Sequence, residues 1–328
     1  MKKDNLLNIS IYHPNGRKYF YFLEKNKHLK VSFRPYVFIR KKLGYHKGDN
    51  GKVKGNMLFK LPSRSNISIF CMSPFDPNVL IIIFQKLFFN SKIIYHTSSA
   101  DHVNGNFFKL LAPIFRFIIN KFVDVVVCTP KVIENELKKT YQTKIVGIDH
   151  PFENIDLSFI DKKETDYIFV GEKSKKKGFD RFMTLAKLFP NKKFISVGTE
   201  LEFSDLKTTN NHESYGFKNK KDVYKLIQKS KFLLVPSRSV NGWEELFGIV
   251  IIEALSLGTG VIASDHQGPK YIQTKVKNSI KLVKDSDDVW NKIDLNHFKY
   301  SVKKVNLDFL TESFIQSQWL ELFDTLDA

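Results

Sequence analysis

The sequence predicts an α/β protein of two doubly wound, Rossmann-like domains with a cleft between them. From about residue 67 onward, short β-branched runs alternate with longer amphipathic segments, and the same rhythm repeats in the second half of the chain. The 328 residues are enough for two domains of about 150 residues each. Strand–helix alternation favours parallel sheets with helices on both faces, which bind ligands at the carboxyl ends of their strands.

The expected elements follow from these runs in chain order. Buried strands of the first half are predicted at ISIFCMS, KIIYHTS, DVVVCTP and KIVGIDHP, with helices over 104–121 and 131–140. Strands of the second half are predicted at DYIFVGE, KFISVGT, KFLLVPS and GVIASD, with helices near 178–189, 220–229, 247–257 and 311–325. Residues 30–65 are basic and rich in glycine and aromatic residues, and we expect surface strands and loops there.

The net charge of +18 is concentrated in the first half of the chain. Residues 1–150 hold 25 basic and 9 acidic side chains, whereas 151–328 hold 27 and 25. This asymmetry indicates an anionic partner for the first half: nucleic acid, a phosphate-rich substrate or a membrane surface. Because no nucleic-acid-binding motif accompanies the charge, we expect no nucleic acid and favour an anionic membrane surface.

One apolar segment of the basic half has two interpretations. Residues 106–122 carry three basic side chains, Lys109, Arg116 and Lys121, and no acidic one. Such a segment could lie at a membrane interface with these cations toward the headgroups. The alternative is an ordinary buried helix of the first domain. Pro113 is expected to break or kink it.

Other features bound the compartment. Cys71 and Cys128 lie in apolar runs, which predicts buried thiols in a reducing environment, and their spacing suits no metal site. The first residues lack the apolar core of a signal peptide. The longest apolar stretch, 79–84, falls far short of the roughly 20 residues of a membrane helix. We therefore expect a cytoplasmic protein, with the inner face of the plasma membrane as an attachment site.

The most informative segment is residues 235–272. After a predicted strand come Glu245 and then Gly248, which precedes a predicted helix. Glycine lets a ligand approach the first backbone N–H groups of that helix, at Ile249 and Val250. Those groups favour an anion such as phosphate.

Glu253, eight residues after Glu245, lies in the otherwise apolar run IVIIEALSL. A carboxylate is costly to bury there unless something donates a hydrogen bond to it. The hydroxyl groups of a ribose would do so, and so would a nearby lysine or a backbone donor.

Together these residues resemble the E-x7-E signature of retaining glycosyltransferase family 4, a family with the GT-B fold. The residues that match in register are Pro236, Ser237, Glu245, Phe247, Gly248, Glu253, Ala254, Gly258, Thr259, Gly268 and Pro269. The resemblance covers residues 166–327 well, 67–150 more loosely and 17–66 scarcely. It implies sugar transfer from a nucleotide-sugar donor, a UDP-sugar before a GDP-sugar, to a glycan or lipid-linked acceptor. It also implies no cofactor and no metal.

The resemblance assigns roles to the matching residues. Glu245 is expected to contact hydroxyl groups of the donor sugar, and Glu253 the ribose of the nucleotide. The N–H groups of Gly248, Ile249 and Val250 would hold the distal phosphate of the donor.

A second motif, FVGEKSKKKGFDRF at 169–182, matches the family's Lys-Gly step at Lys177 and Gly178. In the family these positions face the donor diphosphate, and Lys177 is expected to stabilise it as the bond breaks. Glu172 stands where the family has arginine, a reversal of charge. Lys173 or one of the next lysines would supply the missing positive charge. The alternative is a solvated lysine loop.

Three further candidates come from weaker matches. His96, at the end of a predicted strand, is expected to orient a donor hydroxyl, without a general-base role; a purely structural histidine is the alternative. Gly16, before an aromatic-rich helix, would let the backbone approach the diphosphate or acceptor, or would simply belong to a β-turn. Phe217 is a candidate for the base site, with a core aromatic as the alternative.

The resemblance also orders the domains. Residues 1–155 would form the acceptor-side domain, 156–310 the donor-binding domain, and 311–328 a helix that crosses back to the first. The family and the composition indicate bacterial surface polysaccharide synthesis. The alternatives are an inactive GT-B relative that binds a sugar nucleotide or a partner, supported by Glu172, and a GT-B epimerase acting on a nucleotide sugar.

Overall fold

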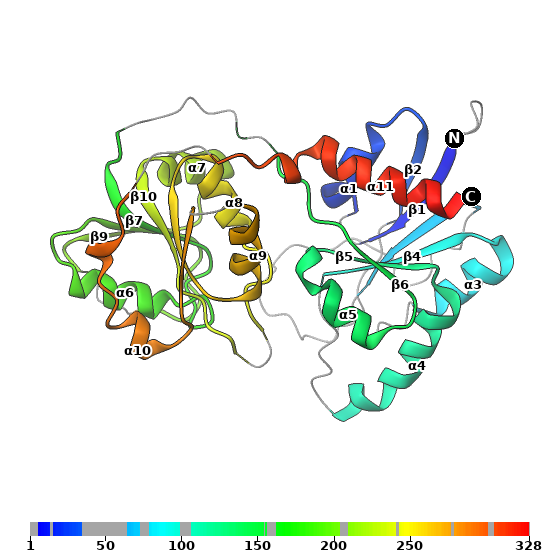
Figure 1. Cartoon of the computed structure of the whole chain (residues 1–328), viewed down its shortest axis with the longest axis horizontal. Coiled ribbons are helices and arrows are strands. Elements are labelled where there is room, and N and C mark those ends of the chain that lie inside the picture. Colours follow the sequence, from blue (N-terminus) through cyan, green and yellow to red (C-terminus); the bar gives the residue numbers. More distant parts are fainter. Residues whose placement is uncertain are drawn as a thin grey trace. The chain divides into compact units, whose positions relative to one another are not determined.

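The computed structural model describes the chain as two compact units (Figure 1). Unit 1 comprises residues 1–151 and 309–328, and unit 2 comprises residues 152–308. The described residues are 6–13, 16–34, 64–72, 79–98, 106–153, 155, 162–203, 209–240, 243–276, 279–300 and 305–327, with backbone alone for 106–111. Two predictions fall partly outside the described residues. They are the surface strands and loops expected over 30–65, at residues 35–63, and the expected β-turn, at residues 14–15.

Unit 1 is built on a parallel sheet of six strands in the order β2-β1-β3-β4-β5-β6. The strands are β1 (Leu7–Tyr12), β2 (Leu29–Arg34), β3 (Ile67–Cys71), β4 (Lys92–Thr97), β5 (Val125–Cys128) and β6 (Lys144–Gly147). Both Cys71 and Cys128 are buried free thiols in this sheet. The order reverses direction at β1, whose neighbours are β2 and β3.

Helices cover both faces of this sheet. Its helices are α1 (Gly16–Glu24), α3 (Val79–Phe89), α4 (Asn106–Phe122), α5 (Glu134–Thr140) and α11 (Glu312–Asp327), with a 3-10 turn, η1 (Lys131–Ile133), before α5. Side chains of α1 and α11 share one core with alternate residues of the strands, including Phe20, Trp319 and Ile94. The next strand residue, Tyr95, faces the other way and meets Phe115 of α4.

The described side chains of the apolar segment 106–122 are buried on one side of the helix and exposed on the other. Phe115 and Ile119 are buried, whereas Ile114 and Phe117 are 59% exposed. Pro113 lies inside α4, which continues past it as one helix. The side chain of Lys109 lies outside the described residues.

Unit 2 repeats the architecture with a parallel sheet ordered β12-β11-β10-β7-β8-β9. Its strands are β7 (Thr165–Val170), β8 (Phe194–Val197), β9 (His212–Tyr215), β10 (Ser230–Val235), β11 (Gly260–Ser264) and β12 (Ile280–Val283). Its helices are α6 (Phe179–Leu188), α7 (Lys220–Gln228), α8 (Ile249–Ser256), α9 (Gln267–Lys275) and α10 (Asp287–Trp290). Two 3-10 turns follow, η2 (Leu295–His297) and η3 (Asp308–Leu310). The chain passes from unit 2 back to unit 1 within η3.

The aromatic core of unit 2 lies on the α6 side of the sheet. Phe169, Phe182 and Phe194 pack there with Trp290 of α10. Because the alternate strand residues Ile168 and Leu233 are also fully buried, both faces of the sheet are covered. The structure thus confirms the predicted class, an α/β protein with two parallel sheets.

Within the described part of the chain, no helix is long and apolar enough to cross a membrane. In the same residues, no group of three or more His, Cys, Asp and Glu side chains is placed to hold a metal ion.

Candidate functional site

The candidate site of unit 2 lies where its sheet reverses order. Strand β7 pairs with β8 on one side and with β10 on the other, and the loops that follow β7 and β10 leave from the same edge. Ligands of doubly wound sheets bind at such a topological switch point, outside the carboxyl ends of the strands. The loops that carry Lys177 and Glu245 both begin there.

Lys177 and Glu245 form an ion pair although 68 positions separate them. The Lys177 Nζ lies 2.7 Å from the Glu245 Oε2, and the side chains are 28% and 15% exposed. The same ammonium lies 4.8 Å from the ring centroid of Trp243. An ion pair and a cation–π contact together hold this ammonium at the site.

The loop before α8 is fixed by its backbone. The Glu245 N–H donates to Nδ1 of His266 at 3.1 Å, and the Gly268 N–H donates to the Glu245 carbonyl at 2.9 Å. Gly248 caps α8 with φ 67°, in the left-handed region that favours glycine. The first helical hydrogen bond closes from Ile251 N–H to Gly248 at 2.7 Å, so the preceding N–H groups, the predicted phosphate ligands, lie at the open helix start.

Gly178 joins the loop after β7 to the loop after β10. It caps α6 with φ 72°, and a Cβ at this position would lie 1.9 Å from the Pro236 carbonyl oxygen. No other residue fits without moving that backbone. Nearby, the Arg238 N–H donates to the Lys176 carbonyl at 2.8 Å. Tight contact of two loops therefore places Lys177 opposite Glu245.

A buried arginine network supports these loops. Arg181, 3% exposed, donates to the Pro236 and Ser237 carbonyls at 3.1 Å and pairs with Asp285 and Asp287 at 2.8 and 2.7 Å. The guanidinium and hydrogen-bond donors around Asp285 outweigh its burial and lower the pKa of that carboxyl to about 2. The carboxylates stay charged in the working pH range.

His266 and Arg238 extend the same network. His266 Nε2 lies 3.0 Å from Asp285, and Arg238 makes a bidentate pair with Asp180 at 2.6 and 2.8 Å. Sequence reasoning missed these residues, along with Arg181. A signal exists for Arg181, because a charged residue is unexpected at the third position of a helix that begins against a buried strand. The acidic run after β12 gave no comparable hint.

Glu253 lies one layer deeper, on α8. Its Oε1 accepts a hydrogen bond from the Tyr224 hydroxyl at 3.0 Å. Burial raises the pKa of Glu253, while Tyr224 and Lys220 oppose the rise. Burial likewise raises the pKa of Tyr224 to about 12. The carboxylate thus has a hydroxyl partner from α7, where a lysine or backbone donor was the expected alternative to ribose.

The lysines before α6 have different surroundings. Lys173 is 1% exposed, and its Nζ contacts Ser214 and Glu200 at 2.6 and 2.9 Å, so its ammonium is held inside unit 2 rather than presented as the expected replacement charge. Glu172 pairs with Lys176 at 3.5 Å. Lys173 therefore departs from the alternative of a solvated lysine loop, whereas Lys175 and Lys176 are exposed.

Phe217 and Gly16, two weaker candidates, differ in burial. Phe217 is 81% exposed between β9 and α7, so the core-aromatic alternative is wrong. Gly16 begins α1 and is buried, and a Cβ there would lie 2.9 Å from the Phe33 ring. Close packing is thus one reason for glycine at position 16.

His96 is buried at the carboxyl end of β4 in unit 1. Its Nε2 lies 3.0 Å from the Thr129 hydroxyl, and its ring meets Phe20 edge-on at 5.3 Å. Burial, reinforced by His150 and His13, lowers the pKa of His96 to about 3. The imidazole is therefore neutral near pH 7, a state suited to an orienting hydrogen bond.

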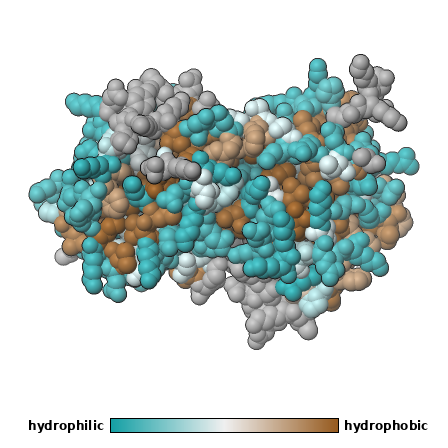
Figure 2. All heavy atoms as spheres, in the orientation of Figure 1, coloured by the Kyte–Doolittle hydropathy of each residue, from teal (hydrophilic) through white to brown (hydrophobic). Residues whose placement is uncertain are grey.

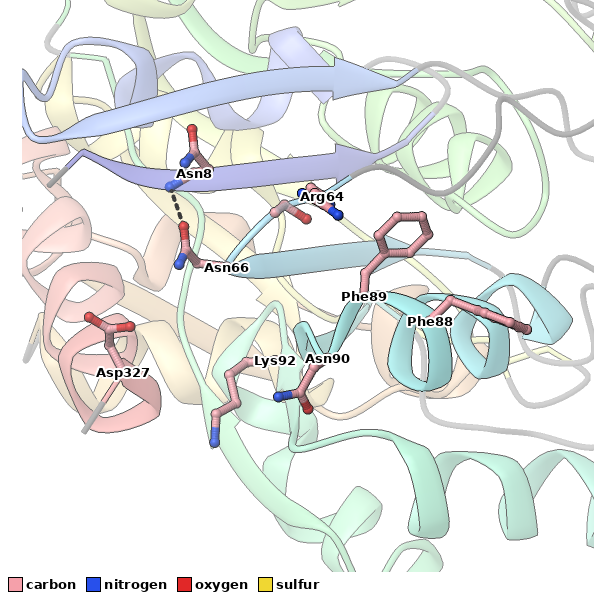
Figure 3. A pocket seen from close by; sticks show the side chains of 9 residues that line it. Asn8, Arg64, Asn66, Phe88, Phe89, Asn90, Lys92 and Asp327 are labelled. Carbon is pink, nitrogen blue, oxygen red and sulfur yellow. Dashed lines mark hydrogen bonds between the residues drawn. The ribbon is translucent and has the colours of Figure 1, made fainter.

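A cavity of about 600 Å³ lies at the opposite, amino-terminal edge of the unit 1 sheet (Figure 3). Its lining residues are Asn8, Arg64, Ser65, Asn66, Phe88, Phe89, Asn90, Lys92 and Asp327. The Asn8 N–H donates to the Asn66 side chain at 3.0 Å, which ties β1 to the start of β3. Sequence reasoning had no signal for this cavity, because its residues come from four separate segments.

A protein-family model matches most of unit 2. Residues 152–294 match the protein-family model described as Glycosyl transferases group 1. The whole unit 2 site described above falls in this range. Residues 152–294 of unit 2 are thus similar to glycosyl transferases group 1, and this similarity supports a glycosyltransferase.

A curated relative and several solved structures are also similar to this chain. A curated "Uncharacterized 42.6 kDa protein in cps region" of Klebsiella pneumoniae is 28% identical over 155 residues, which cover 45% of this chain and 39% of the relative. The match therefore spans about two fifths of that relative's length. AviGT4, a glycosyltransferase involved in avilamycin A biosynthesis, is 14% identical with a TM-score of 0.51, covering 80% of this chain and 75% of that chain.

A third similar protein is the UDP-GlcNAc 2-epimerase from Neisseria meningitidis bound to UDP-GlcNAc. It is 11% identical with a TM-score of 0.54, and the match covers 97% of this chain and 99% of that chain. At such identities the likeness concerns the fold alone. Together with the family match, it confirms the expected GT-B fold.

Proposed function

We propose that this protein is a retaining glycosyltransferase of the family 4 type that moves a sugar from a nucleotide-diphosphate donor, a UDP-sugar before a GDP-sugar, to a glycan or lipid-linked acceptor. The observation that carries the proposal is the Lys177–Glu245 pair beside the start of α8, at the switch point of a unit similar to glycosyl transferases group 1. A cation and open helix N–H groups suit a diphosphate, and a neighbouring carboxylate suits sugar hydroxyls.

The proposed chemistry is electrostatic. The bond between the anomeric carbon and the diphosphate oxygen breaks, and the acceptor oxygen bonds to that carbon from the same face. The acceptor proton leaves with the diphosphate. Lys177 and the N–H groups of Gly248, Ile249 and Val250 stabilise the charge that develops on the diphosphate. His96 and Gly16 of unit 1 are proposed to contact the donor sugar and the acceptor, and Phe217 the base.

Nucleotide recognition is proposed to rest on Glu253. Its carboxylate accepts from Tyr224 and has capacity for further donors, which the ribose hydroxyl groups would supply. The UDP-GlcNAc bound by the epimerase of the same fold supports a uridine nucleotide.

The biological setting is proposed from the relatives and from charge. The cps region of the Klebsiella relative supports capsular polysaccharide synthesis. The basic first half supports an acceptor on an anionic glycan or membrane, with residues 1–155 on the acceptor side, 156–310 on the donor side and a cytoplasmic location.

A thermal-shift series with UDP, GDP, ADP, CMP and dTDP sugars tests the donor proposal. Stabilisation by one nucleotide family, lost in Glu253→Ala, together with sugar transfer lost in Glu245→Ala, is the expected result. Stabilisation without transfer to any glycan or lipid-linked acceptor would favour an inactive relative, for which Glu172 is the supporting residue. Stabilisation by no nucleotide contradicts the proposal.

An epimerase is the second candidate, because the matched epimerase aligns over nearly its full length. The two activities differ in their need for an acceptor. Proton NMR of UDP-GlcNAc incubated with the protein alone separates them. An epimerised sugar nucleotide would replace the transferase proposal, whereas unchanged donor agrees with it.

A further inference from the structure

Helices α3 and α4 of unit 1 leave a row of large apolar side chains exposed. On α3, four of them lie along one side of the helix: Leu80, Phe84, Leu87 and Phe88, which are 51%, 55%, 65% and 71% exposed. On the neighbouring α4, Ile114 and Phe117 are both 59% exposed. We call these six residues the apolar face. Figure 2 shows brown, hydrophobic side chains at the right edge, where Figure 1 draws α3.

The apolar face is not a by-product of core packing. The opposite side of α3 already supplies Val79, Ile82 and Gln85 to the buried interior. On the exposed side, the Phe84 and Phe88 rings stack with centroids 5.5 Å apart and planes 16° apart. A group of large apolar side chains that stays exposed on neighbouring helices marks an interaction site.

The two helices that form the apolar face carry basic side chains and no acidic ones. Neither helix contains Asp or Glu, whereas α4 carries Arg116 and Lys121. The Lys121 Nζ lies 5.3 Å from the Phe117 ring centroid, so this cation borders the face directly. Lys86 of α3 pairs with Asp124 at 2.7 Å and adds little net charge.

The cavity of Figure 3 extends this positive border. Phe88 belongs both to the apolar face and to the cavity lining, which includes Arg64, Lys92 and the carboxylate of Asp327. Apolar side chains flanked by an excess of cations complement a surface that is apolar inside and anionic outside. A second copy of the same face would instead bring like charges together, which opposes self-association.

We propose that the apolar face docks onto a membrane rich in anionic phospholipid, with its side chains among the acyl chains and Arg116 and Lys121 at the headgroups. The inference deepens the proposed function, because a lipid-linked acceptor would lie on that surface, but docking requires no sugar transfer. Such attachment is interfacial and weakens with salt.

Vesicle sedimentation with the full chain tests the proposal. The vesicles are phosphatidylcholine with one-third phosphatidylglycerol, compared with pure phosphatidylcholine. Phe84→Ser/Phe88→Ser should lower the partition coefficient on anionic vesicles at least about tenfold. Arg116→Gln/Lys121→Gln should lower it about 30-fold. Leu188→Ser, at a 52% exposed position on α6 of unit 2, is the matched control and should leave it unchanged.

Three outcomes overturn the proposal. The first is equal partitioning of the wild type and the Phe84→Ser/Phe88→Ser variant, and the second is equal wild-type binding to both vesicle types. The third is a lipid-free dimer that this variant dissociates in analytical ultracentrifugation, which would assign the face to a second copy. Thermal unfolding checks that each variant is folded. Glu253→Gln should lose affinity for UDP, but its partition coefficient on vesicles should equal that of the wild type. A failure of the nucleotide proposal can therefore be told apart from a failure of the docking proposal.

Discussion

Replacing Glu253 with glutamine should stabilise the free protein while it weakens nucleotide binding. The substitution keeps the size of the side chain and an acceptor for the Tyr224 hydroxyl, which lies 3.0 Å from Oε1. It removes a charge whose burial raises the pKa of the carboxyl. An incompletely bonded buried polar group costs about 1–3 kcal/mol, and the Tyr224 bond offsets part of that. We expect the free energy of unfolding near pH 7 to rise by about 1 kcal/mol.

The stability difference between Glu253→Gln and the wild type should depend on pH in a defined direction. A carboxyl whose pKa is higher in the folded state contributes stability below its unfolded-state pKa, and that contribution is lost as pH rises through the folded-state pKa. Glu253→Gln and the wild type should therefore be equally stable in acid and diverge toward neutral pH. Urea denaturation across that range measures the difference. The control Tyr224→Phe keeps the charge, removes its donor and should destabilise.

Binding supplies the second half of the test. Hydrogen bonds to a charged acceptor contribute about 1.5–3 kcal/mol, against about 0.5–1.5 for a neutral one. Ribose hydroxyl groups that donate to Glu253 would therefore lose about 1–2 kcal/mol, which raises the Kd for UDP roughly 5- to 30-fold. Titration calorimetry measures it. An unchanged Kd in a folded Glu253→Gln protein refutes the ribose assignment, and a less stable variant at neutral pH refutes the burial argument.

Three further substitutions and one control, Gly216→Ala, test the loops around the switch point. Lys177→Met should reduce the rate of sugar transfer by about 100-fold and, since its ion pair is partly exposed, change stability by less than about 1 kcal/mol; near-wild-type turnover contradicts its role. Gly178→Ala puts a Cβ 1.9 Å from a backbone oxygen at φ 72° and should cost more than about 2 kcal/mol in urea denaturation. Gly216→Ala, with no atom within 4 Å, should stay within about 0.5 kcal/mol, and equal effects would reject the loop contact. Arg181→Met should lower the free energy of unfolding by about 3–5 kcal/mol, because it leaves buried partners uncompensated; a loss below about 1 kcal/mol would show that water replaces it.

The strands that could be predicted from the sequence are those that carry their signal within one short segment. Central parallel strands such as β5 and β10 are buried on both faces, so they read as continuous β-branched or apolar runs. Helix α3 was missed because VLIIIFQKLFF is apolar on nearly every side. It therefore lacks the alternation of apolar and polar residues that identifies an amphipathic helix. Strand β12 was missed because four residues with a charged member carry little signal.

The candidate site was predictable where one segment holds it and unpredictable where the fold assembles it. Glu245, Gly248 and Glu253 are close in sequence, and their spacing around a helix start was legible. The pairing of Lys177 with Glu245 depends on a contact between two loops 68 positions apart. The burial of Lys173 against Glu200 likewise requires β7 and β8 to be neighbours, which no local pattern states.

The position of α11 sets an order for biosynthesis. Five side chains of α11 complete the core of unit 1, whose other buried members all precede residue 149: Ile315, Trp319, Leu322, Phe323 and Leu326. On the ribosome, that core therefore stays open while all of unit 2 is made, for roughly 8–30 s at about 5–20 residues per second. Unit 2 is contiguous in sequence, so its core needs no residues that are synthesised later. Chains stalled after residue 308 should consequently show a protease-resistant unit 2 and a protease-sensitive unit 1, and equal resistance of both would exclude this order.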